Sequence, residues 1–188
     1  MRASERAYQA LRAEILDWSL PPGAGLGEVE QADQLFDLRI ALESLLARRA
    51  AQRATPETAA RFTALAARFH EAGEALRAGT DPADYYAMTA ELDASLDEAA
   101  ANPYLVSTLR TLRLHLARLR RLAADDPARL ATSAAEHADI ADAVGSGAAD
   151  LAEATTRVHL HHAFHHLTRR TRADETPTLL SPTEGDRP

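Results

Sequence analysis

The 188-residue chain contains no cysteine, so disulfide bridges, thiolate metal sites and cysteine nucleophiles are excluded. Lysine is also absent, and every strongly basic side chain is an arginine. Aromatic residues make up only 5% of a chain that is 46% hydrophobic, so leucine and alanine must build the core, as in packed helices. No apolar run approaches the roughly 20 residues that cross a membrane.

The chain carries a formal net charge of −7 at pH 7. Such an acidic chain is not suited as a whole to nucleic acid, although a local basic patch could still bind it. Its first residues form an amphipathic stretch that contains acids and lacks the apolar core of a signal peptide. The length fits one domain, or one domain with a fragment. We expect a soluble cytoplasmic protein that does not contact a membrane.

Periodic leucines and alanines predict helices along most of the chain. The predicted helices span residues 3–17, 34–53, 56–77, 82–100, 103–123, 133–145 and 148–172. Capping residues followed by proline, or a capping box, mark four of their starts. These start signals are Thr55 with Pro56, Asp81 with Pro82, Asn102 with Pro103, and the box formed by Ser133 and Glu136.

No stretch shows convincing strand alternation, so the predicted fold class is all-α. We expect an antiparallel helical bundle of about six to seven helices, preceded by an orphan N-terminal helix. Residues 24–33 are expected to form a connector, and the polar, proline-rich residues 173–188 a disordered tail. One stripe of the helix at 34–53 is expected to face the core, and it consists of Leu35, Leu38, Leu42, Leu45 and Leu46.

Two acids and two histidines form the most informative set of polar residues. Asp93 and Asp97 lie one helical turn apart and therefore on the same face, and His137 and His159 follow on later helices. Like charges at this spacing repel each other, and a bound cation would relieve the repulsion. Oxygen and imidazole donors together suit Zn, Mn, Ni or Fe. The alternative is a solvated acidic face with ordinary surface or core-edge histidines, and both interpretations stay open.

Two further clusters have structural explanations that we prefer. The run HLHHAFHH pairs His161 with His165 and His162 with His166 at helical spacing, and an exposed helix end explains it. Five arginines, including Arg113, lie on the predicted helix 103–123, and a solvated face paired with nearby acids explains them. The exposed histidines should still bind nickel resin.

Four segments occur in an order that resembles one family. The segments are RAYQALRAEILDWSLPPGAGLGE, QLFDLRIALESLLARRAAQRAT, AELDASLDEAAANPYLVSTL and EHADIADAVGSGAADLAEATTRVHL. They resemble the GntR family of bacterial transcription regulators, in its FadR-type branch with an FCD effector domain. The resemblance covers residues 5–31 and 34–166. It divides the chain into a remnant of a winged-helix DNA-binding domain (1–33), an effector-binding helical bundle (34–172) and a tail (173–188).

The resemblance implies a metal and an effector in the bundle. Metal-binding members hold a divalent metal with one Asp and three His, often beside a small carboxylate. Asp93 matches that Asp, and His137 and His159 match two of the histidines, whereas Asp97 stands where the third histidine is usual. Arg39 would bind the effector carboxylate through a bidentate guanidinium, or would only form a salt bridge with Glu43 one turn away.

The family's recognition helix and wing are missing from this sequence. After Glu28 the chain passes through VEQADQ directly into the effector-domain pattern, so roughly 45 residues of the usual pattern are absent, among them the helix that enters the major groove. The resemblance thus implies an effector sensor that forms a homodimer, or a heterodimer with a full-length regulator, and reaches DNA only through such a partner. The alternatives are a metal-dependent enzyme that uses the same cavity, and a degraded regulator that only folds.

Overall fold

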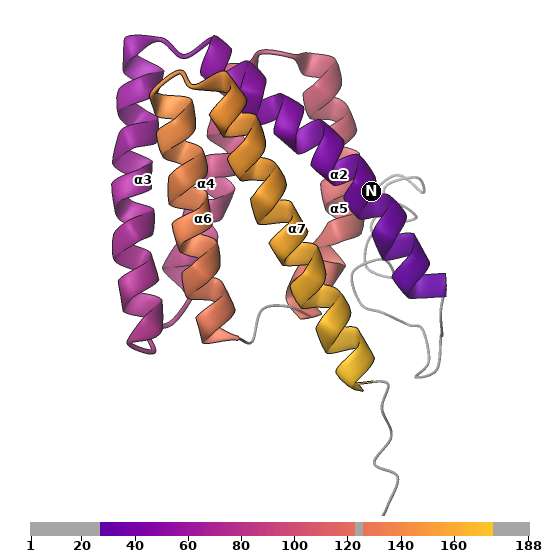
Figure 1. Ribbon diagram of the computed structural model, residues 1–188. Helices are drawn as coiled ribbons and strands as arrows, with labels where there is room; N and C mark the ends of the chain where they lie inside the picture. The colour runs from indigo at the N-terminus through magenta and orange to yellow at the C-terminus, as the bar shows by residue number, and fades with distance from the viewer. Residues whose placement is uncertain (1–26, 123–125, 175–188) are drawn as a thin grey trace, which may run out of the picture.

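The computed structural model describes residues 27–122 and 126–174, with side chains described at 33–113 and 126–169. All regular structure in these ranges is α-helical (Figure 1). The helices are α2 (Gly27–Gln52), α3 (Pro56–Arg77), α4 (Ala83–Ala100), α5 (Pro103–Leu122), α6 (Pro127–Gly145) and α7 (Ala149–Asp174). The predicted all-α bundle is therefore confirmed. The predicted helix at 3–17 and most of the predicted disordered tail lie outside the described residues.

Capping residues set the starts of α3 and α5 as the sequence predicts, whereas α4 begins at Ala83, with Pro82 rather than Asp81 at the N-cap position. The Thr55 hydroxyl accepts a hydrogen bond from the backbone N–H of Thr58, and the Thr58 hydroxyl accepts one from the backbone N–H of Thr55, which forms a capping box. Asn102 Oδ1 accepts from the N–H of Leu105 at the start of α5. At the other end of α3, Gly79 takes a φ of +86°, which the left-handed end of a helix requires.

Two predicted boundaries are wrong. Helix α2 begins at Gly27, so the predicted connector is helical from residue 27 onward. Helix α6 begins at Pro127, because Asp126 caps it by accepting hydrogen bonds from two backbone N–H groups, and proline suits the first helical position. Ser133 is thus not a cap but lies buried inside α6, and His137 lies well inside the helix rather than on its first turn.

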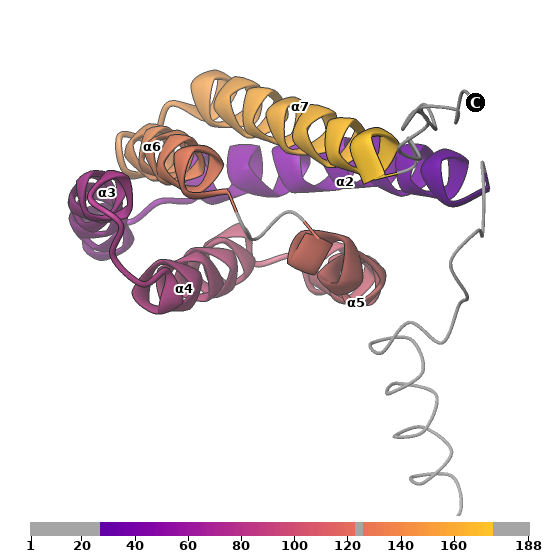
Figure 2. The same cartoon turned by 90° about the horizontal axis from the view of Figure 1, so that it is seen from below.

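Helix α2 runs through the middle of the bundle and contacts α4, α5, α6 and α7. Figure 2 shows α6 and α7 along one side of the bundle and α4 and α5 along the other, with α3 at one end. Helix α3 packs mainly on α6. In the part of the chain described by the structure, no helix is long and apolar enough to cross a membrane.

Alanine and glycine let α3 and α6 approach each other closely. Ala131, Ala134, Ala138 and Ala141 follow one face of α6 and are almost completely buried. A Cβ atom added to Gly145 of α6 would lie 3.1 Å from Thr63 Oγ1 and 3.2 Å from the carbonyl oxygen of Ala59 on α3, closer than ordinary van der Waals contact. The small side chains explain how a chain with so few aromatic residues fills its core.

The leucine stripe predicted on α2 is only partly correct. Leu46 is fully buried, and Leu35 and Leu42 pack against the core, but Leu38 is 54% exposed. The buried face of α2 instead includes Arg39 and Glu43, whose exposures are 6% and 7%. Burying a charged side chain costs much free energy unless the charge is paired. These two side chains lie where α2 borders a cavity.

Candidate functional site

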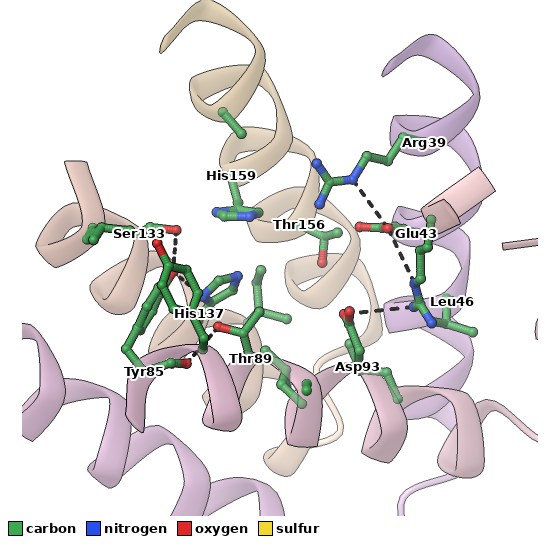
Figure 3. A pocket seen from close by; sticks show the side chains of 18 of the residues that line it. Arg39, Glu43, Leu46, Tyr85, Thr89, Asp93, Ser133, His137, Thr156 and His159 are labelled. Carbon is green, nitrogen blue, oxygen red and sulfur yellow. Dashed lines mark hydrogen bonds and ion pairs between the residues drawn. The ribbon is translucent and has the colours of Figure 1, made fainter. Parts of the chain in front are cut away.

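A cavity of about 460 Å³ lies among α2, α4, α5, α6 and α7 (Figure 3). Its apolar lining includes Leu46, Leu92, Leu96, Leu130 and Ile140. Its polar lining includes Arg39, Glu43, Thr89, Asp93, Arg113, Ser133, His137, Thr156 and His159. A largely apolar cavity with a few converging polar groups is typical of a small-ligand site. Figure 3 shows Arg39, Glu43 and Asp93 toward one side and Tyr85, Ser133 and His137 toward the other.

Arg39 extends from α2 into the cavity (Figure 3). Its Nε lies 3.3 Å from Glu43 Oε1, and its guanidinium carbon lies 5.3 Å from the centre of the Phe36 ring. The salt bridge to Glu43 proposed from the sequence is therefore present. Because Arg39 also lines the cavity, the salt bridge does not exclude a contact between its guanidinium and a ligand.

Arg113 of α5 lies among three carboxylates. Its Nη1 lies 2.9 and 3.1 Å from the two carboxylate oxygens of Asp97, its Nη2 lies 3.8 Å from Asp93 Oδ1, and its Nε lies 3.7 Å from Glu43 Oε1. Burial alone would lower the Arg113 pKa, but the charges of Asp93 and Glu43 and the hydrogen bonds to Asp97 raise it. The expected pairing with acids is confirmed. The expected solvated face is wrong here, because the side chain is only 16% exposed.

Glu136 connects the two histidine-bearing helices. Its Oε2 lies 2.8 Å from His159 Nδ1 and accepts hydrogen bonds from Arg129 at 3.0 Å, and its Oε1 lies 2.7 Å from His162 Nδ1. Burial would raise the Glu136 pKa, but the hydrogen bonds from His159 and Arg129 outweigh it and lower the pKa to about 2. Glu136 is therefore a permanent carboxylate that fixes the His159 ring.

His159 is buried in a way that favours the neutral imidazole. Burial lowers its pKa, and although the hydrogen bond to Glu136 opposes this, the pKa stays below its ordinary value. A neutral ring that donates its Nδ1 proton to Glu136 keeps a lone pair on Nε2. Near neutral pH, Nε2 of His159 is then a hydrogen-bond acceptor.

His137 and Tyr85 form a second polar group in the cavity wall. The Tyr85 hydroxyl donates to Ser133 Oγ at 2.8 Å and lies 3.2 Å from His137 Nδ1. Burial raises the Tyr85 pKa, so the hydroxyl keeps its proton. The rings of His137 and His159 lie 4.4 Å apart, centre to centre. The two predicted histidines are thus neighbours, although α6 and α7 each hold one.

Three of the four predicted metal ligands line the cavity, namely Asp93, His137 and His159, but Asp97 does not. Both Asp97 oxygens contact Arg113 instead. Within the described ranges, no group of three or more histidine, aspartate and glutamate side chains is close enough to hold a metal ion. The arrangement therefore does not fit the predicted metal, and metal binding and metal identity stay predictions.

A helical bundle around a cavity with polar groups at its wall is typical of a small-ligand sensing domain. A comparison with family models identifies the FCD domain at residues 34–162. Because this match spans most of the chain, the chain belongs to the FCD-domain family, the effector domain of GntR/FadR-type regulators. No curated protein matches the chain in a sequence comparison.

Sequence patterns alone did not assign Arg113, Tyr85 or Glu136 to the site, although Arg113 belongs to a cluster of arginines and Glu136 to a capping-box pattern. A signal existed for Arg113, because it follows Leu109 and Leu112 on a buried leucine stripe and so stands at the edge of the core. For Ser133 the signal was hidden by the misplaced start of α6. Once the helix begins at Pro127, Ser133 and His137 are one turn apart and share a face.

Proposed function

We propose that this chain is an effector-sensing domain that binds a small carboxylate in the cavity beside α2. The observation that supports this proposal most directly is the position of Arg39, whose buried guanidinium lies at the wall of a largely apolar cavity. An arginine binds a carboxylate through two parallel hydrogen bonds, which become stronger away from water. The FCD family, which consists of regulator domains, supports a sensing role rather than a catalytic one.

The neutral His159 suggests a second requirement on the ligand. Its Nε2 accepts hydrogen bonds, so it would repel a carboxylate oxygen and favour a hydroxyl donor. We therefore expect a carboxylate that carries a hydroxyl group. Malate and succinate differ only in such a hydroxyl, and malate should bind about tenfold more tightly, which corresponds to one neutral hydrogen bond. Equal affinities would contradict the role of His159.

Isothermal titration with malate, succinate and related small carboxylates tests the proposal. Arg39→Lys keeps the charge but loses the bidentate geometry, and it should weaken binding at least about tenfold. Arg77→Lys is a matched control, because Arg77 is 53% exposed and pairs with Glu74 on the surface. Binding that is insensitive to Arg39→Lys, or no binding of any carboxylate in the series, would refute the proposal.

We further propose that the domain reaches DNA only through a partner chain. This is supported by α2, which begins at Gly27, so the residues just before the FCD match are helical and continuous with its first helix. Only residues 29–33 separate Glu28 from the FCD match, which leaves no room there for a recognition helix and wing. Tight and salt-sensitive gel shifts of the neighbouring promoter by the purified chain alone would contradict this. Native mass spectrometry with a full-length relative would detect the expected heterodimer.

A further inference from the structure

Three carboxylates from two helices converge on one guanidinium at the side of the cavity. Glu43 comes from α2, Asp93 and Asp97 come from α4, and Arg113 comes from α5. Arg113 lies within 3.8 Å of all three. The side chains of Asp93 and Asp97 are 25% and 23% exposed, and that of Glu43 is 9% exposed. Carboxylates gathered this closely require a cation, because their mutual repulsion is only weakly screened away from water.

Arg113 supplies that positive charge from within the protein. Asp97, the residue that departs from the usual histidine, has both oxygens on Arg113 Nη1, at 2.9 and 3.1 Å. Asp97 is thereby directed away from the cavity wall that Asp93, His137 and His159 form. An aspartate at this position is explained as the partner of a buried arginine, whereas a histidine there could not balance the guanidinium charge.

We propose that Arg113 takes the place of a divalent metal in this cavity, which makes the site a metal-independent anion-binding site. The inference rests on the proposed function for the identity of the anion. Arg113 is a positioning residue: its single positive charge is shared by Asp93 and Asp97 and links α5 to α4, and its contact with Glu43 links α5 to α2. Arg39 is the guanidinium that meets the carboxylate of the ligand.

Zinc retention by the purified chain tests the inference without any knowledge of the effector. His161 and His165 form an exposed pair one turn apart on α7 that would bind zinc nonspecifically, so all measurements use a His161→Ala, His165→Ala background. After zinc loading and dialysis, metal content measured by mass spectrometry should be the same with and without Asp93→Asn. Stoichiometric zinc that is retained in this background and lost on His137→Ala would overturn the inference.

Replacing Arg113 should restore a need for metal. In Arg113→Met the side chain keeps an unbranched apolar stem and loses its charge, which leaves Asp93 and Asp97 without the guanidinium they share, while Glu43 keeps its ion pair with Arg39. Zinc or manganese should then raise the melting temperature of Arg113→Met, but not that of the parent or of Arg113→Lys, which keeps the charge. A rise in the parent and none in Arg113→Met would overturn the inference. If Arg113→Met fails to fold, zinc retention by the parent decides the question alone.

Malate binding with and without a chelator separates this inference from the proposed function. The affinity of the parent for malate should be unchanged by EDTA, and a loss of binding in EDTA would refute metal independence. If no carboxylate binds under any condition, the proposed function fails, while the zinc measurements still decide whether Arg113 replaces a metal.

Discussion

At the scale of single residues, Tyr85 shows how the cavity wall depends on one hydroxyl. It donates to Ser133 and lies beside His137, while its ring packs edge-on against Phe69 at 6.2 Å. Serine and histidine are both buried here, at 8% exposure each. The hydroxyl therefore sets the orientation of His137 as well as satisfying buried polar groups.

Tyr85→Phe should lower the free energy of unfolding by about 1–3 kcal/mol, because it keeps the ring and leaves buried polar atoms without their partner. Urea denaturation measures the change. Tyr104→Phe is the control, since Tyr104 is 85% exposed and its loss of a hydroxyl should cost less than about 0.5 kcal/mol. Equal effects of the two substitutions would show that the Tyr85 hydrogen bonds contribute nothing to stability.

Asp97 shows, also at the residue scale, where sequence reasoning reached its limit. Spacing alone placed Asp93 and Asp97 on one face of α4, and that is how they lie. Spacing could not identify which neighbour compensates their charge, because Arg113 comes from a different helix. Either a metal ion or a guanidinium can compensate the charge of these two carboxylates. Which of the two does so depends on where α5 places Arg113 relative to α4, and the local sequence does not give that position.

At the scale of helices, the C-terminal end of α4 has a residue in a strained backbone conformation and is capped by a side chain from the segment that follows α2. Ala101 takes a φ of +46°, in the left-handed region that disfavours a side chain. Arg53, just beyond α2, donates to the carbonyl oxygens of Ala100 and Ala101, both at 3.1 Å. This cap satisfies carbonyl groups that the end of a helix leaves without partners, and it joins the end of α4 to the central helix.

Ala101→Gly should raise the free energy of unfolding by about 1 kcal/mol, because glycine adopts a positive φ without strain. The matched control is Ala78→Gly at the end of α3, where φ is −79° and alanine fits well. That substitution should lower stability by roughly 0.5–1 kcal/mol. Opposite signs in urea denaturation are the expected result, and a loss of stability in Ala101→Gly would contradict the account.

Helix starts could be predicted where a capping residue precedes a proline, as at Thr55 and Asn102. The start of α6 carries the same signal, Asp126 before Pro127, but the capping-box pattern of Ser133 and Glu136 predicts a later start. Both patterns predict a helix start, and the local sequence does not show that Ser133 is buried. In the structure the Ser133 hydroxyl accepts a hydrogen bond from Tyr85, 48 positions away, instead of capping a helix. Local rules therefore predicted the helices better than the site between them.

At the scale of the whole molecule, stability should decrease in acid through two linked groups. The folded state lowers the His159 pKa, so the unfolded state takes up a proton first as pH falls below about 6.5, and stability decreases from there. The folded state also lowers the Glu136 pKa from 4.5 to about 2, so its contribution is complete above 4.5 and is lost between these values. That second contribution is on the order of 3 kcal/mol.

Urea denaturation at a series of pH values measures both steps. His159→Gln should flatten the decrease near and below pH 6.5, and Glu136→Gln should flatten the decrease below pH 4.5. A wild-type profile that is flat between pH 7 and pH 4 would contradict the assignment of a neutral, buried His159.

Helix α2 forms part of the cavity wall and also extends well beyond the cavity, to Gly27. It is 26 residues long, so at 1.5 Å per residue it is about 39 Å from end to end. Arg39 lies twelve residues from Gly27, roughly 18 Å along the axis. A tilt of about 5° about a pivot at Arg39 would move the Gly27 end by roughly 1.5 Å, on the scale of helix shifts in allosteric proteins. A tilt caused by the binding of a small anion would thus become a displacement at Gly27, the first residue that the structure describes.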